Sequence, residues 1–145
     1  MPVITLLRGL PGCGKTTYAL SNLRHDTLIE ADNYLYTAEG KYLWTPERVV
    51  QAHTQAQAEL VQALAEGKSV VVANTFSRHW EMESYLSLAP AHYTRVVIDL
   101  FDGGGLTDEI LGARNVHGVP AEKIAAMRAR WEPLPPYACR DGKGR

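Results

Sequence analysis

The chain has 145 residues, of which 46% are hydrophobic and 21% charged, with a formal net charge of −1 and a pI near 6.5. This length suits one compact domain, and the near-neutral charge lacks the basic excess of a protein whose main task is to bind nucleic acid, so any such contact must be local. No apolar run reaches the ~20 residues of a membrane helix, and the first residues lack a basic leader region, which predicts a protein that is neither membrane-bound nor exported.

Short strands and longer helices are predicted to alternate along the first part of the chain. The branched apolar run Val3–Leu7 predicts a buried strand, and Lys15–Leu23 has the spacing of a helix. Thr27–Ile29 predicts a second short strand, so that Asp32 leaves the C-terminal end of that strand. The aromatic and irregular segment Tyr34–Trp44 predicts a surface loop.

A long helix and a strand are predicted next. Thr45 and Pro46 are typical of a helix start, and Gly67 is typical of its end. Apolar or weakly polar residues recur along this helix and predict the face that packs on the sheet: Val49, His53, Ala56, Leu60 and Leu64. We interpret His53 on that face as a packing histidine. Ser69–Ala73 then predicts an all-apolar strand.

The second half continues the alternation. Ser77 is predicted to cap a helix, and Thr94–Leu100 predicts the next strand, which ends before the glycines at 103–105. The helix that begins after Ser77 is expected to carry Met82, Tyr85 and Leu86 on the side that faces the core. Two more helices are predicted over 107–118 and 120–131. Together these elements predict an α/β fold, with a parallel sheet flanked by helices on both faces and ligands bound at the C-terminal ends of the strands.

The end of the chain differs in composition from the rest. It is rich in proline and polar residues, and its last six residues are mostly basic or glycine. We therefore predict a domain of residues 1–133 followed by a loose polar tail of residues 134–145.

One motif carries most of the chemistry. Gly9–Thr16 fits the pattern of a glycine, four residues and Gly-Lys-Thr, between a predicted strand and a predicted helix. Its glycines let backbone N–H groups face phosphates, and the helix N-terminus adds partial positive charge. ATP is expected to be held by Gly9, Leu10, Pro11, Gly12, Cys13, Gly14, Lys15 and Thr16. Lys15 is expected to bridge the β- and γ-phosphates during catalysis, and the Thr16 hydroxyl to ligate Mg²⁺.

The two cysteines, Cys13 and Cys139, are too few for a disulfide framework. Cross-linking Cys13 would also obstruct the phosphate-binding loop. These observations suit a reducing cytoplasm, and we interpret Cys13 as a passive position in the loop.

Asp32 is the candidate general base. It leaves the strand Thr27–Ile29, which is expected to lie beside the strand that feeds the phosphate-binding loop. A carboxylate there could accept the proton of an attacking hydroxyl, whereas the neighbouring Asn33 could only form hydrogen bonds. The alternative is that Asp32 closes an Asx turn at the end of the strand.

Four separated segments give the chain a resemblance to a known family: Arg8–Thr17, Ala31–Tyr34, Asn74–Thr75 and Ala113–Pro120. Nearly end to end, the chain resembles the P-loop kinase domain of phage polynucleotide 5′-hydroxyl kinase and its eukaryotic kinase-like relatives, a group that includes AAA-type and zeta-toxin-like P-loop kinases. The resemblance implies a three-layer P-loop NTPase of the nucleoside-kinase type with a helical lid. It also implies that the ATP-binding loop extends to Thr17.

The resemblance implies two catalytic residues outside the loop, namely Asp32 as base and Arg114 as a lid arginine that reaches the ATP phosphates. A guanidinium supplied after the glycines at 103–105 could close over the nucleotide and stabilise charge on the transferring group. The alternative for Arg114 is a cation that offsets the dipole at a helix C-terminus.

Two positions depart from the family pattern. Leu35 stands where the phage enzyme has an arginine thought to grip the phosphate of the substrate. The predicted strand that ends at Asn74 carries no Walker-B-like aspartate, so Mg²⁺ is expected to depend on Thr16 and water.

Several polar residues are candidates for the acceptor side. Asn74 could contact substrate or a metal-bound water, or simply close a turn. Arg78 is the other substrate candidate, and Arg128 and Arg130 could complete a basic rim, although lone surface arginines are usually solvated. An aromatic cluster could stack on nucleic-acid bases or tie its own loop down by packing: Tyr34, Tyr36, Tyr42 and Trp44.

Three functions fit these features. The first is an ATP-dependent kinase that acts on the 5′-hydroxyl of a polynucleotide. The second is a kinase for a small molecule such as a nucleoside, sugar or metabolite, which Leu35 and the acidic pI favour. The third is a regulatory module that binds NTP and hydrolyses it slowly, against which Asp32 argues because a mere binder has no use for a base.

Overall fold

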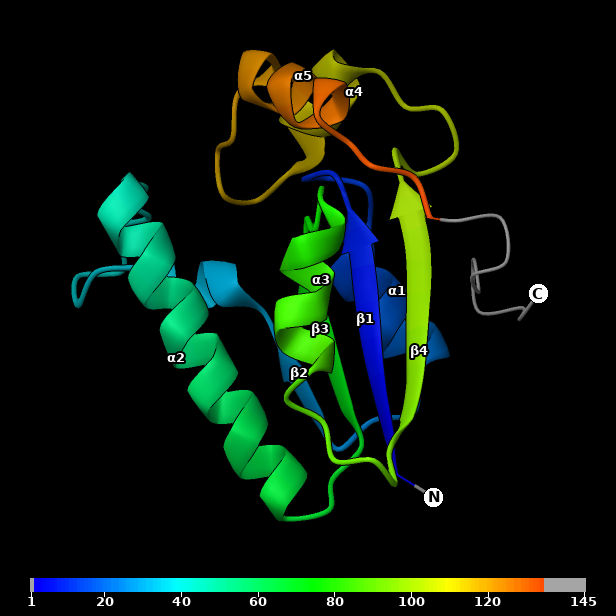
Figure 1. The fold of residues 1–145 in the computed structure, drawn as a ribbon. Coiled ribbons are helices and arrows are strands. Elements are labelled where there is room, and N and C mark those ends of the chain that lie inside the picture. The colour runs from blue at the N-terminus through cyan, green and yellow to red at the C-terminus, as the bar shows by residue number, and fades with distance from the viewer. Residues whose placement is uncertain (1, 135–145) are drawn as a thin grey trace.

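The computed structural model describes residues 2–134 of the chain. Its sheet has four parallel strands in the order β2-β3-β1-β4 (Figure 1). The strands are β1 Val3–Gly9, β2 Thr27–Ile29, β3 Val70–Asn74 and β4 Thr94–Phe101. The parallel α/β sheet predicted from the alternating pattern is therefore confirmed.

The order of the strands corrects one expectation. We expected β2, which leads to Asp32, to lie beside β1, but β3 lies between them, with Arg8 of β1 opposite Asn74 and Ile29 of β2 opposite Val72. All five residues of β3 are buried, as suits a central strand covered on both faces. The three-residue β2 is only partly buried and forms the edge.

Helices cover both faces of this sheet, as predicted. Helix α1, Lys15–Asn22, packs on one face, and helices α2, Pro46–Ala65, and α3, His79–Leu86, pack on the other (Figure 1). The larger core cluster joins α2 and α3 to side chains of β1 and β3, and includes Ile4, Leu6, Leu60, Val70, Val72, Met82 and Tyr85. The smaller cluster under α1 includes Leu7, Ala19, Val71 and Ile98.

Helix α2 begins as the sequence predicts. Thr45 is its N-cap and accepts a hydrogen bond from the backbone N–H of Arg48 at 3.1 Å. Its fully buried residues are Ala52, Ala56, Leu60, Ala63 and Leu64. Val49 and His53 are only partly buried, because the first turns of α2 face a cavity. His53 bonds the Tyr85 hydroxyl through Nδ1 at 2.7 Å, which supports its interpretation as a packing histidine.

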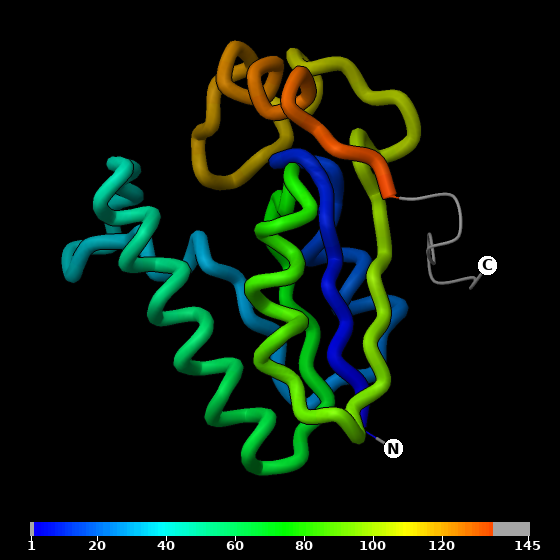
Figure 2. Tube along the Cα trace, in the orientation of Figure 1, coloured from blue at the N-terminus to red at the C-terminus, as the bar shows by residue number. Residues whose placement is uncertain are grey.

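Two short helices, which we call the lid together with the loop that joins them, cover the C-terminal end of the sheet (Figures 1 and 2). They are α4, Asp108–Arg114, and α5, Ala121–Ala129. Helix α4 ends four residues before the predicted Gly118 because the Asn115 side chain leaves the helix to bind the following loop, donating to Val119 O at 2.9 Å and accepting from Val119 N at 2.8 Å. Helix α5 likewise ends at Ala129, before the predicted Trp131.

Two further local expectations were wrong. The segment that we predicted as a surface loop begins inside a 3-10 helix, η1, Ala31–Leu35, which buries Leu35 against α2. The N-cap of α3 is Arg78 and not Ser77, because the buried Ser77 hydroxyl donates instead to the Glu81 carboxylate at 3.0 Å.

The predicted tail lies, apart from its first residue, outside the described residues. That first residue, Leu134, is buried in the larger core cluster. Within the described residues, none of the helices has both the length and the apolar character needed to span a bilayer.

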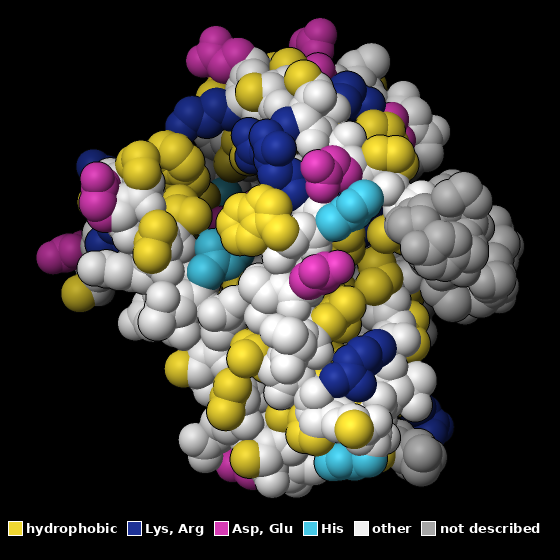
Figure 3. Space-filling model, viewed as in Figure 1, with side chains coloured by type: hydrophobic (Ala, Val, Ile, Leu, Met, Phe, Trp, Pro, Cys, Tyr) yellow, Lys and Arg dark blue, Asp and Glu magenta, His cyan; other side chains and the backbone are white. Residues whose placement is uncertain are grey.

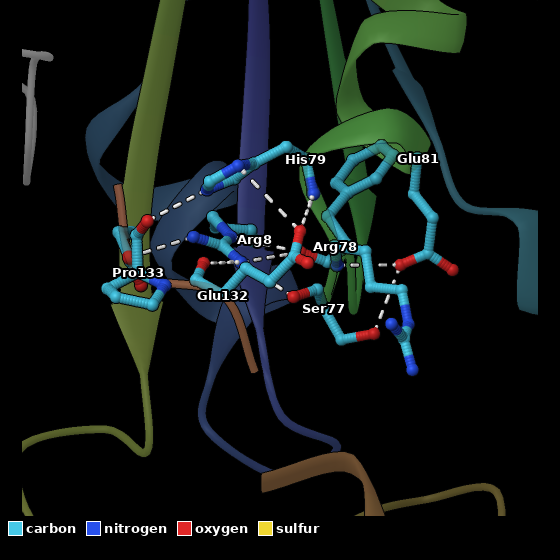
Figure 4. A network of polar contacts seen from close by, with 9 residues as sticks. Arg8, Ser77, Arg78, His79, Glu81, Glu132 and Pro133 are labelled. Atoms are coloured by element: carbon cyan, nitrogen blue, oxygen red, sulfur yellow. Dashed lines mark hydrogen bonds and ion pairs between the residues drawn. The ribbon is translucent and has the colours of Figure 1, made fainter. Parts of the chain in front are cut away.

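A buried arginine joins β1 to the end of the described chain (Figure 4). Arg8, which is 0% exposed, donates through Nε and Nη2 to the carbonyl of Phe76 at 3.0 and 2.7 Å, and Nη2 also donates to the carbonyl of Glu132 at 2.9 Å. Its Nη1 pairs with Asp99 at 3.3 Å, and its guanidinium lies 3.9 Å from the centre of the Trp131 ring. Burial lowers the pKa of Arg8, and Asp99 opposes that shift.

Replacing Arg8 should destabilise the fold. Arg8→Ala would remove the side-chain donor of the buried Phe76 carbonyl and one charged partner of Asp99, so we expect a loss of about 3–5 kcal/mol in the free energy of unfolding, measured by urea denaturation. The exposed Arg24, beyond the C-terminus of α1, provides a matched control, and Arg24→Ala should change stability by less than about 0.5 kcal/mol. Equal stability of the two variants would contradict this role for Arg8.

Candidate active site

The loop of residues 9–16, which is predicted to bind phosphate, joins β1 to α1 at the C-terminal end of the sheet. Gly12 and Gly14 have φ values of +82° and +100°, which disfavour residues with a side chain. A Cβ atom at Gly12 would also lie 2.3 Å from the carbonyl oxygen of Leu111, in α4. Gly12 is therefore required both by the turn and by the close contact with α4, and Gly14 is required by the turn.

A cavity of about 190 Å³ lies against this loop. Its walls come from the loop, the ends of β2 and β3, and the lid, and they include Gly12, Gly14, Lys15, Thr16, Thr17, Glu30, Asp32, Thr75, Arg114 and His117. Lys15 lies inside the curve of the loop and donates through Nζ to the carbonyls of Gly9 and Leu10 at 2.8 and 3.2 Å. Burial raises the pKa of the Cys13 thiol, in keeping with a passive role for that residue.

Arg114 reaches this cavity from the lid. It lies in the last turn of α4, is exposed, and its Nη2 comes within 3.8 Å of the position that a Cβ atom would take at Gly14. No carboxylate of residues 2–134 lies within ion-pair distance of it. A position at the helix end suits both roles predicted for Arg114, namely an arginine that reaches the ATP phosphates and a cation that offsets the helix dipole. Only the first role makes use of its location over the loop.

Glu30 is a site residue that sequence reasoning missed. It follows β2, and its carboxylate accepts a short hydrogen bond from the Thr16 hydroxyl. The small side chain of Ala73, on the intervening strand β3, lines the same cavity and leaves room for Glu30 to reach the loop. Although β3 carries no acid, a carboxylate from the segment after β2 reaches the loop.

The donor set at Thr16 fits a magnesium ion bound with a nucleotide. Mg²⁺ is usually held by one or two protein oxygens, with phosphates and water completing six ligands. The Thr16 hydroxyl and the Glu30 carboxylate are oxygen donors in contact with each other at the phosphate-binding loop. The described residues contain no cluster of three or more His, Cys, Asp or Glu side chains that would form a separate protein-only metal site.

Asp32 lies where three cavities meet. Its side chain is 50% exposed and lines the loop cavity as well as two further cavities of about 160 and 480 Å³. Its Oδ1 accepts from the Tyr42 hydroxyl at 3.4 Å, and its Oδ2 lies 3.8 Å from Nε2 of His117, in the loop between α4 and α5. The structure therefore brings Asp32 beside the phosphate-binding loop even though β2 is not adjacent to β1.

The two cavities beyond Asp32 form a groove between α2 and the lid. Both are lined by Trp44, Thr75, Met127 and Arg130. Figure 3 shows a hollow there, with Lys and Arg side chains on its lid side. Asn74 lines the smaller cavity, and its Oδ1 accepts from the backbone N–H of Ala31 at 3.0 Å. Arg78 is exposed at the start of α3 and lines none of these three cavities.

Residues 4–134 match the family described as an AAA domain. The chain belongs to this family. NEDD4-binding protein 2 of Homo sapiens is 32% identical over 136 residues, which cover 90% of this chain but 8% of the human protein, so this chain spans only a small part of that relative.

Two solved structures show the fold of this AAA domain. The structure of the Pnkp1/Rnl/Hen1 RNA repair complex matches with a TM-score of 0.69 and 17% identity, over 89% of this chain and 43% of the matched chain. An unliganded sugar kinase from a Janibacter species matches with a TM-score of 0.62 and 18% identity, over 97% of this chain and 83% of that chain. The fold is thus shared with a chain of an RNA repair complex and with a sugar kinase.

Proposed function

We propose that this AAA domain is an ATP-dependent phosphotransferase that moves the γ-phosphate of ATP to a hydroxyl, with a polynucleotide 5′-hydroxyl as the best-supported acceptor. The observation that carries the proposal is the position of Asp32. This residue lines both the cavity at the loop and the two cavities of the groove. A base in that position can take the proton from an acceptor in the groove that attacks a phosphate held by the loop.

In the proposed transfer, each residue of the site has one chemical role. The loop from Gly9 to Thr17 holds the phosphates through its backbone N–H groups. The acceptor oxygen forms a bond to the γ-phosphorus while the bond to the β–γ bridging oxygen breaks; the hydroxyl proton passes to Asp32, and ADP leaves. Lys15 and Arg114 offset the negative charge on the phosphates. Mg²⁺, when bound by Thr16 and Glu30, would supply further charge neutralisation.

The groove supports a nucleotide-containing acceptor. Lys123 and Met127 of α5 and its C-cap residue Arg130 follow one another at helical spacing, and all three line the larger cavity together with Trp44. The Lys123 ammonium lies 4.2 Å from the centre of the Trp44 ring. Cations beside an exposed aromatic ring suit a phosphate next to a base. The likeness in fold to the RNA repair complex points the same way.

A small-molecule kinase is the second candidate. Leu35, which stands in the position of the phage arginine, is 2% exposed and lines the smaller cavity with an apolar side chain, so it offers no cation to the phosphate of an acceptor. The net charge of −1 and the likeness to a sugar kinase also support a small acceptor. A cytoplasmic location stays a prediction from the cysteine content.

Transfer of labelled γ-phosphate tests the proposal. The wild-type chain should label a 5′-hydroxyl oligonucleotide in preference to a panel of nucleosides and sugars. Asp32→Asn should reduce kcat by about 10²- to 10⁴-fold with ATP affinity unchanged, because the base is lost but the loop is intact. Lys15→Ala should lose both ATP affinity and transfer. Tight ATP binding without labelling of any acceptor would rule out both kinase candidates.

Glu30 should govern the response to magnesium. In Glu30→Gln, we expect the Mg²⁺ concentration that half-saturates ATP binding to rise about tenfold or more, because a carboxylate at the metal is replaced by a neutral amide. Calorimetric ATP titrations at several Mg²⁺ concentrations measure this directly. Glu39→Gln, at an exposed turn, is the matched control. An unchanged Mg²⁺ dependence in Glu30→Gln would exclude Glu30 from the metal site.

Arg130 should distinguish the two acceptor classes. Its Nε donates to the Ser77 hydroxyl at 3.1 Å, and no carboxylate of residues 2–134 pairs with it, so its Nη groups are available to an anion. For a 5′-hydroxyl nucleotide with a 3′-phosphate, Arg130→Ala should raise KM about ten- to hundredfold, whereas Arg24→Ala should not. An equal KM in both variants, or preferred labelling of an uncharged sugar, would favour the small-molecule candidate.

A further inference from the structure

The lid reaches the proposed base through one residue, His117, which was not among the predicted site residues. His117 lies in the loop between α4 and α5, and its side chain is 21% exposed. Its ring stacks on that of Tyr42, with the ring centres 5.0 Å apart and the planes 23° from parallel. Its Nδ1 lies 2.7 Å from the Tyr36 hydroxyl. Two tyrosines from the segment before α2 therefore hold a histidine from the lid.

The contact with Tyr36 is compatible with a proton on Nε2 of His117. A tyrosine hydroxyl bonded to Nδ1 can donate its own proton there, which leaves the hydrogen of the neutral imidazole on Nε2. That Nε2 faces Oδ2 of Asp32 at 3.8 Å. The contact is longer than a hydrogen bond and acts through the charge of the carboxylate and the dipole of the N–H group.

The other oxygen of Asp32 is held by the same aromatic cluster. The Tyr42 hydroxyl, 3.4 Å from Oδ1, stays protonated because burial and the charge of Asp32 both raise its pKa. Tyr42 and His117 thus face the two carboxylate oxygens from one stacked pair. A carboxylate held at both oxygens keeps its orientation toward the groove, as a general base requires.

The lid loop is built to keep His117 in this position. Asn115, two residues earlier, ties the loop to the end of α4 and to Val119 by four hydrogen bonds. Arg114, which faces the loop cavity, belongs to the same short segment. A movement of this segment would therefore shift Arg114 over the phosphates and His117 against Asp32 together.

We infer that His117 is a positioning residue that orients the Asp32 carboxylate and couples docking of the lid to assembly of the proposed base. Its kinetic consequence rests on the proposed phosphotransfer. The arrangement itself, in which Tyr36, His117 and Asp32 contact one another in series and the imidazole proton lies on Nε2, does not depend on that reaction.

The first experiment measures transfer by substituted chains. His117→Ala should lower kcat about ten- to hundredfold with little change in the KM for ATP, because the base loses its orientation while the phosphate loop is intact. His117→Gln should stay within about threefold of wild type, because the glutamine amide can place an N–H donor where Nε2 lies. His92→Ala, on an exposed turn, should match wild type. A kcat for His117→Gln as low as that for His117→Ala, or a loss confined to the KM for ATP, would overturn the inference.

The second experiment needs no activity. Nitrogen-15 NMR of the wild-type chain should show neutral His117 protonated on Nε2, and Tyr36→Phe should shift the tautomer balance toward Nδ1. The His117 resonances should move in Asp32→Asn and stay in place in Asn33→Ala. Protonation on Nδ1 in the wild type, or no response to Asp32→Asn, would refute the contact even if transfer is observed. If the wild-type chain transfers no phosphate, the proposed function fails, and these spectra alone decide the role of His117.

Discussion

The whole site depends on the buried guanidinium of Arg8, the residue immediately before the phosphate-binding loop. A charge removed from water is costly unless several acceptors surround it. Arg8 meets that condition by binding the carbonyls of Phe76 and Glu132 and the carboxylate of Asp99. These partners belong to the loop after β3, to the segment after α5 and to β4. One side chain therefore fixes the end of β1 relative to the wall of the groove and the base of the lid.

Backbone strain at the strand ends fits this arrangement. Phe76 and Phe101 have φ values of +49° and +46°, in a region that phenylalanine rarely adopts. The Phe76 carbonyl accepts from Arg8, and the Phe101 carbonyl accepts from the backbone N–H of Leu10, at 2.8 Å. Both strained residues thus point their carbonyls at the junction of β1 and the phosphate loop. The surrounding hydrogen bonds stabilise a conformation that the local sequence disfavours.

The sequence predicts the features that depend on residues close together in the chain, and it does not predict those that depend on contacts between distant segments. The phosphate-binding loop, the start of α2 and the parallel sheet depend on local spacing, and all were predicted. The strand beside β1 was predicted wrongly, since β3 and not β2 takes that place. All five residues of β3 are buried, as a central strand requires, whereas the three-residue β2 is only partly buried. Glu30 was missed since its contact with Thr16 exists only once β2 lies one strand away.

The contact between His117 and Asp32 and the different roles of Arg128 and Arg130 could not be predicted from local sequence either. His117 meets Asp32 across 85 positions of sequence, and no local pattern marks that contact. Arg128 and Arg130 look alike in the sequence, yet Arg128 is paired with Asp102 and Asp108 at 2.9 Å, whereas Arg130 lines the groove. Only the packing of α5 separates a structural arginine from a candidate for substrate binding.

The proposed transfer requires that an acceptor hydroxyl meets Asp32 in line with a phosphate held by the loop. A crystal structure with a non-hydrolysable ATP analogue, Mg²⁺ and a 5′-hydroxyl dinucleotide measures this most directly. We expect the hydroxyl oxygen to lie within about 2.6–3.2 Å of an Asp32 carboxylate oxygen and to face the γ-phosphorus. A dinucleotide bound away from the groove between Trp44 and α5, or an Asp32 carboxylate turned away from the bound hydroxyl, would contradict it.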